Sequence, residues 1–204
     1  MTSLRFCACV LLALLPYFLL SDPLAGQTSY PQQEVHVHDL PQVVARSKDP
    51  SDVLAASVEV VVHDRSVCCG KDSALQDSVQ AADPKSLKDI ANRLQGRHLL
   101  SDGRPIMVTT EYIAPDQLTA GHLVYMLMQN HAALMIWNSH LYVVDGAIYL
   151  LAVDNSGLQS VYAIQKFLLS DARFADSRRE VVFNRETEDP AKVQGILFLD
   201  SKPQ

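Results

Sequence analysis

The chain has 204 residues, 48% of them hydrophobic, and a formal net charge of −6 at pH 7, from 17 lysines and arginines against 23 aspartates and glutamates. This length fits one globular domain with an ordinary core. The acidic balance, with no basic cluster interleaved with aromatic residues, excludes the surface that a nucleic-acid-binding protein needs.

Residues 1–26 have the layout of a secretory signal peptide. Arg5 is followed by an apolar run over residues 6–20 and then by small and turn-forming residues. The apolar run is short for a membrane span, and Pro16 interrupts it. We therefore expect cleavage near Gln27, a periplasmic or secreted mature protein, and no membrane span after processing.

Residues 27–51 predict a flexible arm or linker, because they are rich in proline, glutamine, serine and charge. The single domain then covers residues 52–204. Within the arm, His36 and His38 would place both imidazoles on one face of an extended segment, which is half of a metal site. No further ligands follow at a zinc spacing, so the preferred interpretation is a solvated arm, with no metal or other cofactor.

A β-branched apolar run over residues 55–63 predicts a buried strand. This strand leads to Cys68 and Cys69, the two cysteines that remain once Cys7 and Cys9 leave with the signal peptide. Consecutive Cα atoms lie too close together for ordinary disulfide geometry, so the pair is expected to be two thiols in an oxidising compartment.

The cysteine pair leads into a predicted helix start. Free backbone N–H groups and the helix dipole at such a position lower a thiol's pKa. Cys69, next to Gly70, lies closest to that start, so we expect it to be the reactive thiol, with Cys68 pointing toward the sheet.

The rest of the chain alternates helical and strand patterns. Helices are predicted first, and strands dominate later, which indicates an α+β fold. The predicted elements are helices at 71–81, 83–95 (capped by Asp83 with Pro84 behind it) and 115–129, strands at 106–113, 131–137, 141–153 and 161–164, a short helix at 165–170, and strands at 180–184 and 195–199.

The strands at 131–137 and 141–153 form a predicted hairpin that carries two polar residues in apolar surroundings, His131 and Asp145. A two-residue turn would set His131 opposite Gly146 and send Asp145 to the other face of the sheet. A three-residue loop at 137–139 or 138–140 would bring the two side chains together. We therefore expect an odd loop if they act as a pair.

A cysteine at a helix start, a histidine opening a central strand and a carboxylate on the next strand resemble the papain-like cysteine peptidase and acyltransferase superfamily. Cys69-Gly70 with Ala74-Leu75 after it, and His131 with Asp145 fourteen residues later, are closest in layout to the double-glycine (bacteriocin-processing) peptidases. They are similar more loosely to cell-wall endopeptidases of the NlpC type. The resemblance covers roughly residues 55–150.

This resemblance implies a papain-like α+β fold, in which N-terminal helices pack on a C-terminal antiparallel sheet. It implies Cys69 as nucleophile, His131 as general base and Asp145 as the group that orients the imidazole. These enzymes commonly place a glutamine before the cysteine to bind the oxyanion, and here His63 stands in that stretch. His63 is accordingly our candidate oxyanion donor, together with the backbone N–H of Cys69.

Three functions remain open from the sequence. The first is an exported cysteine hydrolase or acyltransferase acting on a peptide or amide bond, with a peptide or cell-envelope component as its partner. The second is a non-catalytic exported binding module of the same fold, which the absent glutamine favours. The third is a metal or redox site at Cys68 and Cys69 with His63. A low-pKa thiol, inert thiols or retained zinc would distinguish them.

Overall fold

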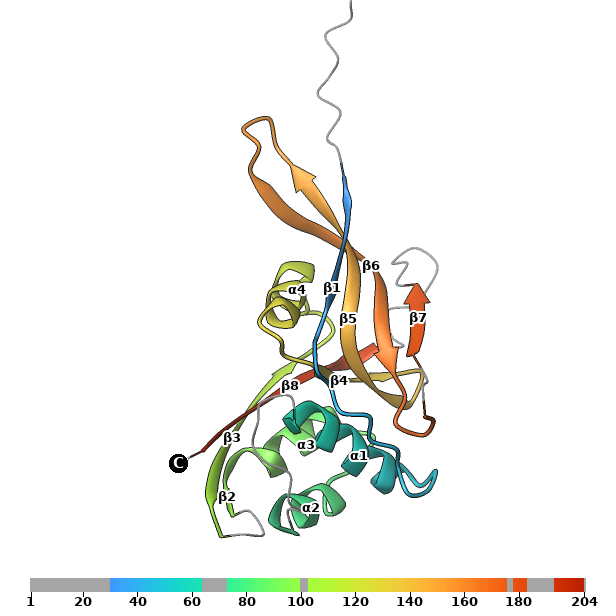
Figure 1. Cartoon of the computed structure of the whole chain (residues 1–204), viewed down its shortest axis with the longest axis vertical. Coiled ribbons are helices and arrows are strands. Elements are labelled where there is room, and N and C mark those ends of the chain that lie inside the picture. Colours follow the sequence, from blue (N-terminus) through green and yellow to red (C-terminus); the bar gives the residue numbers. More distant parts are fainter. Residues whose placement is uncertain (1–29, 64–72, 100–102, 176–177, 183–192, 204) are drawn as a thin grey trace, which may run out of the picture.

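The structure is a computed structural model that describes residues 30–63, 73–99, 103–175, 178–182 and 193–203 (Figure 1). Cys68, Cys69 and the predicted signal peptide lie outside these residues. The described part is an α+β fold, as predicted. Its elements are β1 (Gln32–His36), α1 (Pro50–His63), α2 (Ser73–Gln80), α3 (Leu87–Leu94), β2 (Gly96–Leu99), β3 (Pro105–Ile113), α4 (Ala120–Met128), β4 (Ala133–Trp137), β5 (His140–Val153), β6 (Gln159–Ser170), β7 (Arg178–Val182) and β8 (Val193–Pro203).

The strands of the described residues form one antiparallel sheet in the order β2-β3-β8-β4-β5-β6-β7, and β1 pairs with β5 in addition. The C-terminal strand β8 thus lies between β3 and β4, in the middle of the sheet. Helices α1 and α3 pack against the central strands. Figure 1 shows α1, α2 and α3 gathered together, with β8 and β4 between them and α4. Central strands β4 and β8 therefore run through the buried core.

The segment 55–63, predicted as a buried strand, is instead the C-terminal part of helix α1. Between residues 53 and 62 every side chain except those of Ala55 and Glu59 is buried. A run that is apolar on nearly all sides suits a buried helix as well as a buried strand, so periodicity cannot separate the two. The Ser57 hydroxyl donates to the carbonyl oxygen of Val53 at 2.8 Å, a contact that one helical turn provides. His63 therefore ends a helix rather than a strand.

Helix α3 begins later than predicted, because Ser86 caps it rather than Asp83. The Ser86 hydroxyl accepts from the Asp89 N–H at 3.2 Å. Asp83 instead accepts from the Lys85 N–H at 3.0 Å in the preceding turn. The predicted helix is present, but its predicted cap is wrong, because the chain makes one more turn before the helix starts.

The C-terminal half contains more strand than predicted. Residues 165–170, predicted as a short helix, continue the strand at 161–164, and the two together form β6. The long strand is stabilised on both edges, since β5 pairs with one and β7 with the other. This two-sided pairing overrides the local helical pattern. The predicted strands near 180–184 and 195–199 are confirmed as β7 and β8.

Part of the predicted flexible arm is also strand. Residues 32–36 form β1, in register with residues 146–150 of β5. Val35 and Val37 are buried, whereas Glu34, His36 and His38 are exposed. This alternation is the ordinary signature of a half-buried strand, and it was present in the sequence.

Candidate functional site

His131 lies where α4 turns into β4, a central strand. The helix ends in a tight turn in which Asn130 adopts φ 64° and the His131 N–H donates to the carbonyl oxygen of Met126 at 3.1 Å. Strand β4 starts two residues later, and residues 133–136 are fully buried. The half-buried histidine is therefore anchored by a helix on one side and by the core on the other. The predicted central strand is present, but it begins at Ala133 rather than at His131.

The β4–β5 hairpin has a two-residue turn, so the predicted odd loop is wrong. Trp137 pairs with His140, and both turn residues, Asn138 and Ser139, lie in the left-handed region with φ 50° and 62°. Positive φ at both central residues is typical of a type I′ turn, whose twist matches that of the flanking strands. Continued past the Ala133 pair, this register sets His131 opposite Gly146 rather than Asp145.

Asp145 sits in a β-bulge. Val144 and Gly146 pair with successive residues of β6, and Asp145 between them is skipped. A bulge bends its strand and redirects the extra side chain, so simple alternation no longer fixes where that side chain points. The buried Asp145 carboxylate accepts a hydrogen bond from the Ser170 hydroxyl on β6. Asp145 therefore has a partner on β6 that the sequence did not predict.

The N-terminal arm passes next to Asp145 and next to Asn130, the residue before His131. The Val37 N–H donates to the carbonyl oxygen of Asp145 at 2.8 Å. The Asn130 carboxamide oxygen accepts from the His38 N–H at 2.7 Å, and its amide nitrogen donates to the His38 carbonyl oxygen at 3.4 Å. Neither Asn130 nor β1 was predicted from the sequence, although the alternating residues 34–38 carried the signal for the strand.

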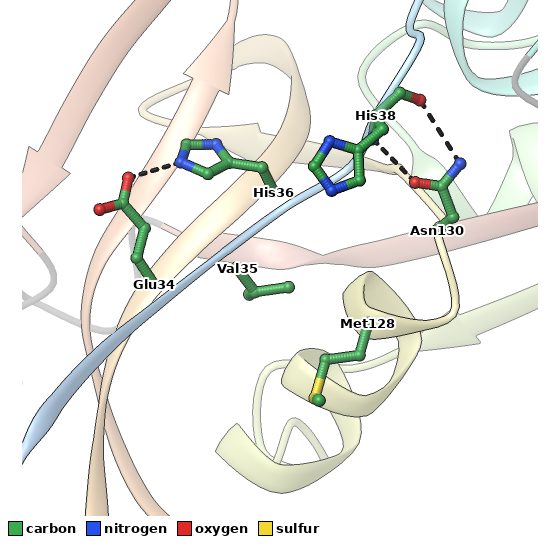
Figure 2. A pocket seen from close by; sticks show the side chains of 6 residues that line it. All are labelled: Glu34, Val35, His36, His38, Met128 and Asn130. Atoms are coloured by element: carbon green, nitrogen blue, oxygen red, sulfur yellow. Dashed lines mark hydrogen bonds and ion pairs between the residues drawn. The ribbon is translucent and has the colours of Figure 1, made fainter.

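A pocket of about 580 Å³ opens between β1 and the end of α4. Figure 2 shows the imidazoles of His36 and His38 on one side of β1, with Val35 pointing toward Met128 on the other. The Nε2 atom of His36 lies 2.5 Å from a carboxylate oxygen of Glu34. Asn130 completes the lining of the pocket, which therefore lies beside the residue preceding His131.

Cys69 and Cys68 lie outside the described residues, between the end of α1 and the start of α2. His63, the predicted oxyanion donor, is the last residue of α1. Helix α2 begins at Ser73, which confirms a helix shortly after the cysteine pair. Helix α1 packs against β4 and β5, and β4 is the strand that follows His131.

Three other histidines each have a local contact. His98 Nε2 lies 2.8 Å from the Leu94 carbonyl oxygen, His122 Nε2 lies 3.2 Å from a Glu111 carboxylate oxygen, and His140 Nδ1 lies 3.1 Å from Arg173. Within the described ranges, no three histidine, cysteine, aspartate or glutamate side chains are arranged to hold a metal ion.

No helix among the described residues is long and apolar enough to cross a membrane. No family model matches the chain, and no curated protein and no solved structure matches it either.

Proposed function

We propose that this protein is an exported cysteine hydrolase or acyltransferase of papain-like type, acting on a peptide or other amide bond. Cys69 is the nucleophile and His131 is the general base. The observation that supports this proposal best is the position of His131, a half-buried imidazole held between the end of α4 and the start of central strand β4. A base needs such a fixed position, because proton transfer depends on its geometry.

The chemistry requires a thiolate and a base within reach of it. A thiol at its ordinary pKa is mostly protonated at neutral pH, so His131 accepts its proton as the sulfur attacks the carbonyl carbon. A carbon–sulfur bond forms, the carbon–nitrogen bond breaks, and the imidazolium returns the proton to the leaving amine. Water then releases the acid, or an amine takes the acyl group, so the same two residues serve hydrolysis and transfer.

Asp145 is not part of this proposal. The two-residue turn makes Gly146, not Asp145, the cross-strand neighbour of His131, and the Asp145 carboxylate accepts from Ser170. We assign it instead to the support of the bulge in β5, next to the candidate site. His63 remains a predicted oxyanion donor. If it has that role, a His63→Ala variant should be acylated more slowly, while the reactivity of its thiol should stay unchanged.

The proposal is tested by labelling the intact protein with a broad probe for nucleophilic cysteines. Wild type should be labelled at Cys69, and labelling should be lost in Cys69→Ser. His131→Ala should slow labelling by about two to four orders of magnitude, the usual contribution of a general base. His122→Ala is the matched control, since it removes an imidazole from the preceding helix α4 and should leave the rate unchanged.

Labelling that persists undiminished in His131→Ala would contradict the proposed role of His131. The non-catalytic binding module would then be the better interpretation. Labelling of Cys68 before Cys69, found by mass spectrometry, would contradict the assignment of the nucleophile.

A further inference from the structure

Among the described residues, one edge of strand β1 pairs with no other strand, and we call it the open edge; helix α4 also contacts β1. The Leu151 N–H donates to the Pro31 carbonyl oxygen, and the Val37 N–H donates to the Asp145 carbonyl oxygen, so the odd-numbered residues of this segment bond to β5. In an antiparallel pair the alternate residues direct their backbone groups the other way. Gln32, Glu34 and His36 therefore present N–H and C=O groups to the opposite edge, where no other described strand pairs with β1.

Asn130 already occupies the far end of this edge. Its carboxamide bonds to both the N–H and the C=O of His38, which is what a neighbouring strand would do. His38 is the next even-numbered residue after His36, so the open edge continues to the two hydrogen bonds between His38 and Asn130. The residue after Asn130 is His131, the candidate base. A chain added along the edge of β1 would thus lead to the candidate catalytic residue.

The pocket beside this edge holds one carboxylate and two imidazoles. Glu34 lines it with half of its side chain exposed and its carboxylate bonded to His36, and neither lysine nor arginine is among its lining residues. Val35 and Met128 supply apolar surface, and the protein as a whole carries a net charge of −6. The pocket therefore suits a side chain with an aliphatic stem and a positive end, as lysine or arginine has.

We propose that the open edge of β1 binds an extended peptide by strand addition, with a basic side chain of the peptide in the pocket beside Glu34. The backbone bonds supply affinity, and the pocket selects the side chain. This inference deepens the proposed function by naming a substrate class, and it rests on that function only for the statement that the peptide is a substrate. Binding can be measured without turnover.

A second copy of the chain fits this edge less well. If two copies paired their β1 strands antiparallel about the centre of the strand, Glu34 of one copy would lie opposite Glu34 of the other. Like charges directly opposite one another destabilise a sheet pair. The same charge attracts a basic peptide, so we assign the edge to a peptide.

The test uses the full-length Cys69→Ser protein, which cannot turn the peptide over, and two capped decapeptides with alternating threonine and lysine or alternating threonine and glutamate. Amide hydrogen exchange is followed residue by residue. On addition of the lysine peptide, the amides of Glu34 and His36 should become protected, whereas that of Val35, already bonded to β5, should change little. The lysine peptide should bind about tenfold more tightly than the glutamate peptide.

Two pairs of variants separate the backbone from the charge. Gln32→Pro removes one outward N–H, and Gln32→Ala, at a residue that does not line the pocket, keeps it, so only the proline variant should weaken binding, by about fivefold. Glu34→Gln should weaken binding of the lysine peptide by about threefold. Asp116→Asn, a change at an exposed carboxylate before α4, should leave it unchanged.

Equal affinity for the two peptides, or no new protection at Glu34 and His36, would overturn the proposal. So would sedimentation of the protein as a dimer that Gln32→Pro converts to a monomer, because the edge would then be occupied by a second copy. The peptide-binding measurements do not depend on Cys69. If the peptide does not bind but thiol labelling behaves as expected, only the peptide-binding proposal fails. If the peptide binds but thiol labelling does not depend on His131, only the proposed function fails.

Discussion

Gly146→Ala tests how closely β1 packs on β5 beside the candidate site. A Cβ atom at this position would lie 2.5 Å from the carbonyl oxygen of Val35, 2.9 Å from Leu168 Cδ1 and 3.2 Å from His36 Nδ1. Side-chain rotation relieves the last two contacts but not the first, because Val35 contributes backbone. Strand β1 must therefore shift away from β5, and overpacking of this kind costs about 1–3 kcal/mol.

Gly121→Ala is the matched control. Gly121 lies in helix α4, and a Cβ there would meet nothing within 4 Å. Alanine is favoured over glycine inside a helix by roughly 0.5–1 kcal/mol, so this variant should be as stable as wild type or somewhat more stable. Replacing glycine by alanine is thus expected to lower the free energy of unfolding at position 146 and to leave it unchanged or raise it at position 121.

Urea unfolding followed by circular dichroism gives both free energies, and amide hydrogen exchange at Val37 reports whether β1 stays docked. In Gly146→Ala the Val37 amide should exchange faster, since its bond to the Asp145 carbonyl oxygen is strained or lost. A Gly146→Ala protein within about 0.5 kcal/mol of wild type, with Val37 still protected, would refute the close packing of β1 against β5.

Three further predictions concern the rest of the fold. Arg173→Ala should lower the free energy of unfolding by about 3–5 kcal/mol, because Arg173 donates to the carboxylate of Asp171 at 2.6 and 2.8 Å and the Asp171 side chain is fully buried. The hydrogen bond to Asp171 raises the pKa of Arg173. As a control, Lys166→Ala at an exposed ion pair should change the urea midpoint little. Hydrogen bonds from the Ser156 side chain and from the Leu158 backbone lower the pKa of Asp154 below 3.8. Because the folded-state pKa is depressed, the ionised Asp154 stabilises the turn fully above pH 3.8, and this stabilisation is lost as the pH falls through the folded-state pKa. The Leu158 N–H should therefore exchange faster in acid, relative to unfolded-peptide rates, and Asp154→Asn should abolish that pH dependence. Asp145→Asn should lower the melting temperature while leaving the labelling rate of Cys69 within about threefold of wild type, since we assign Asp145 to the bulge; a loss as large as that of His131→Ala would restore Asp145 to the catalytic machinery.

The sequence was sufficient to predict the fold class and the central hairpin. The runs at 131–137 and 141–153 are apolar over nearly their whole length, and such runs read as central strands when turn residues separate them. The placement of His131 followed from the same pattern. Residues 55–63 were misassigned because an all-apolar run suits a buried helix equally well, and only packing against the sheet separates the two.

The details of the candidate site could not be predicted in the same way. The bulge at Asp145 depends on how β5 pairs with β6, a contact between residues far apart in sequence. The type I′ turn requires positive φ at Ser139, and a serine in the sequence gives no signal for that conformation. Asn130 acts through a side-chain contact with His38, more than ninety residues away. Local propensity carries no information on such long-range contacts.

The central claim, that His131 activates Cys69, is tested most directly by the pH dependence of thiol alkylation. The measurement uses the processed protein with Cys68→Ser, so that Cys69 is the one thiol left after removal of the predicted signal peptide. The rate should rise with an apparent pKa well below the ordinary thiol value of about 8.5, and His131→Ala should move it back toward that value. Identical rate profiles for the two proteins, with an apparent pKa near 8.5, would contradict the account.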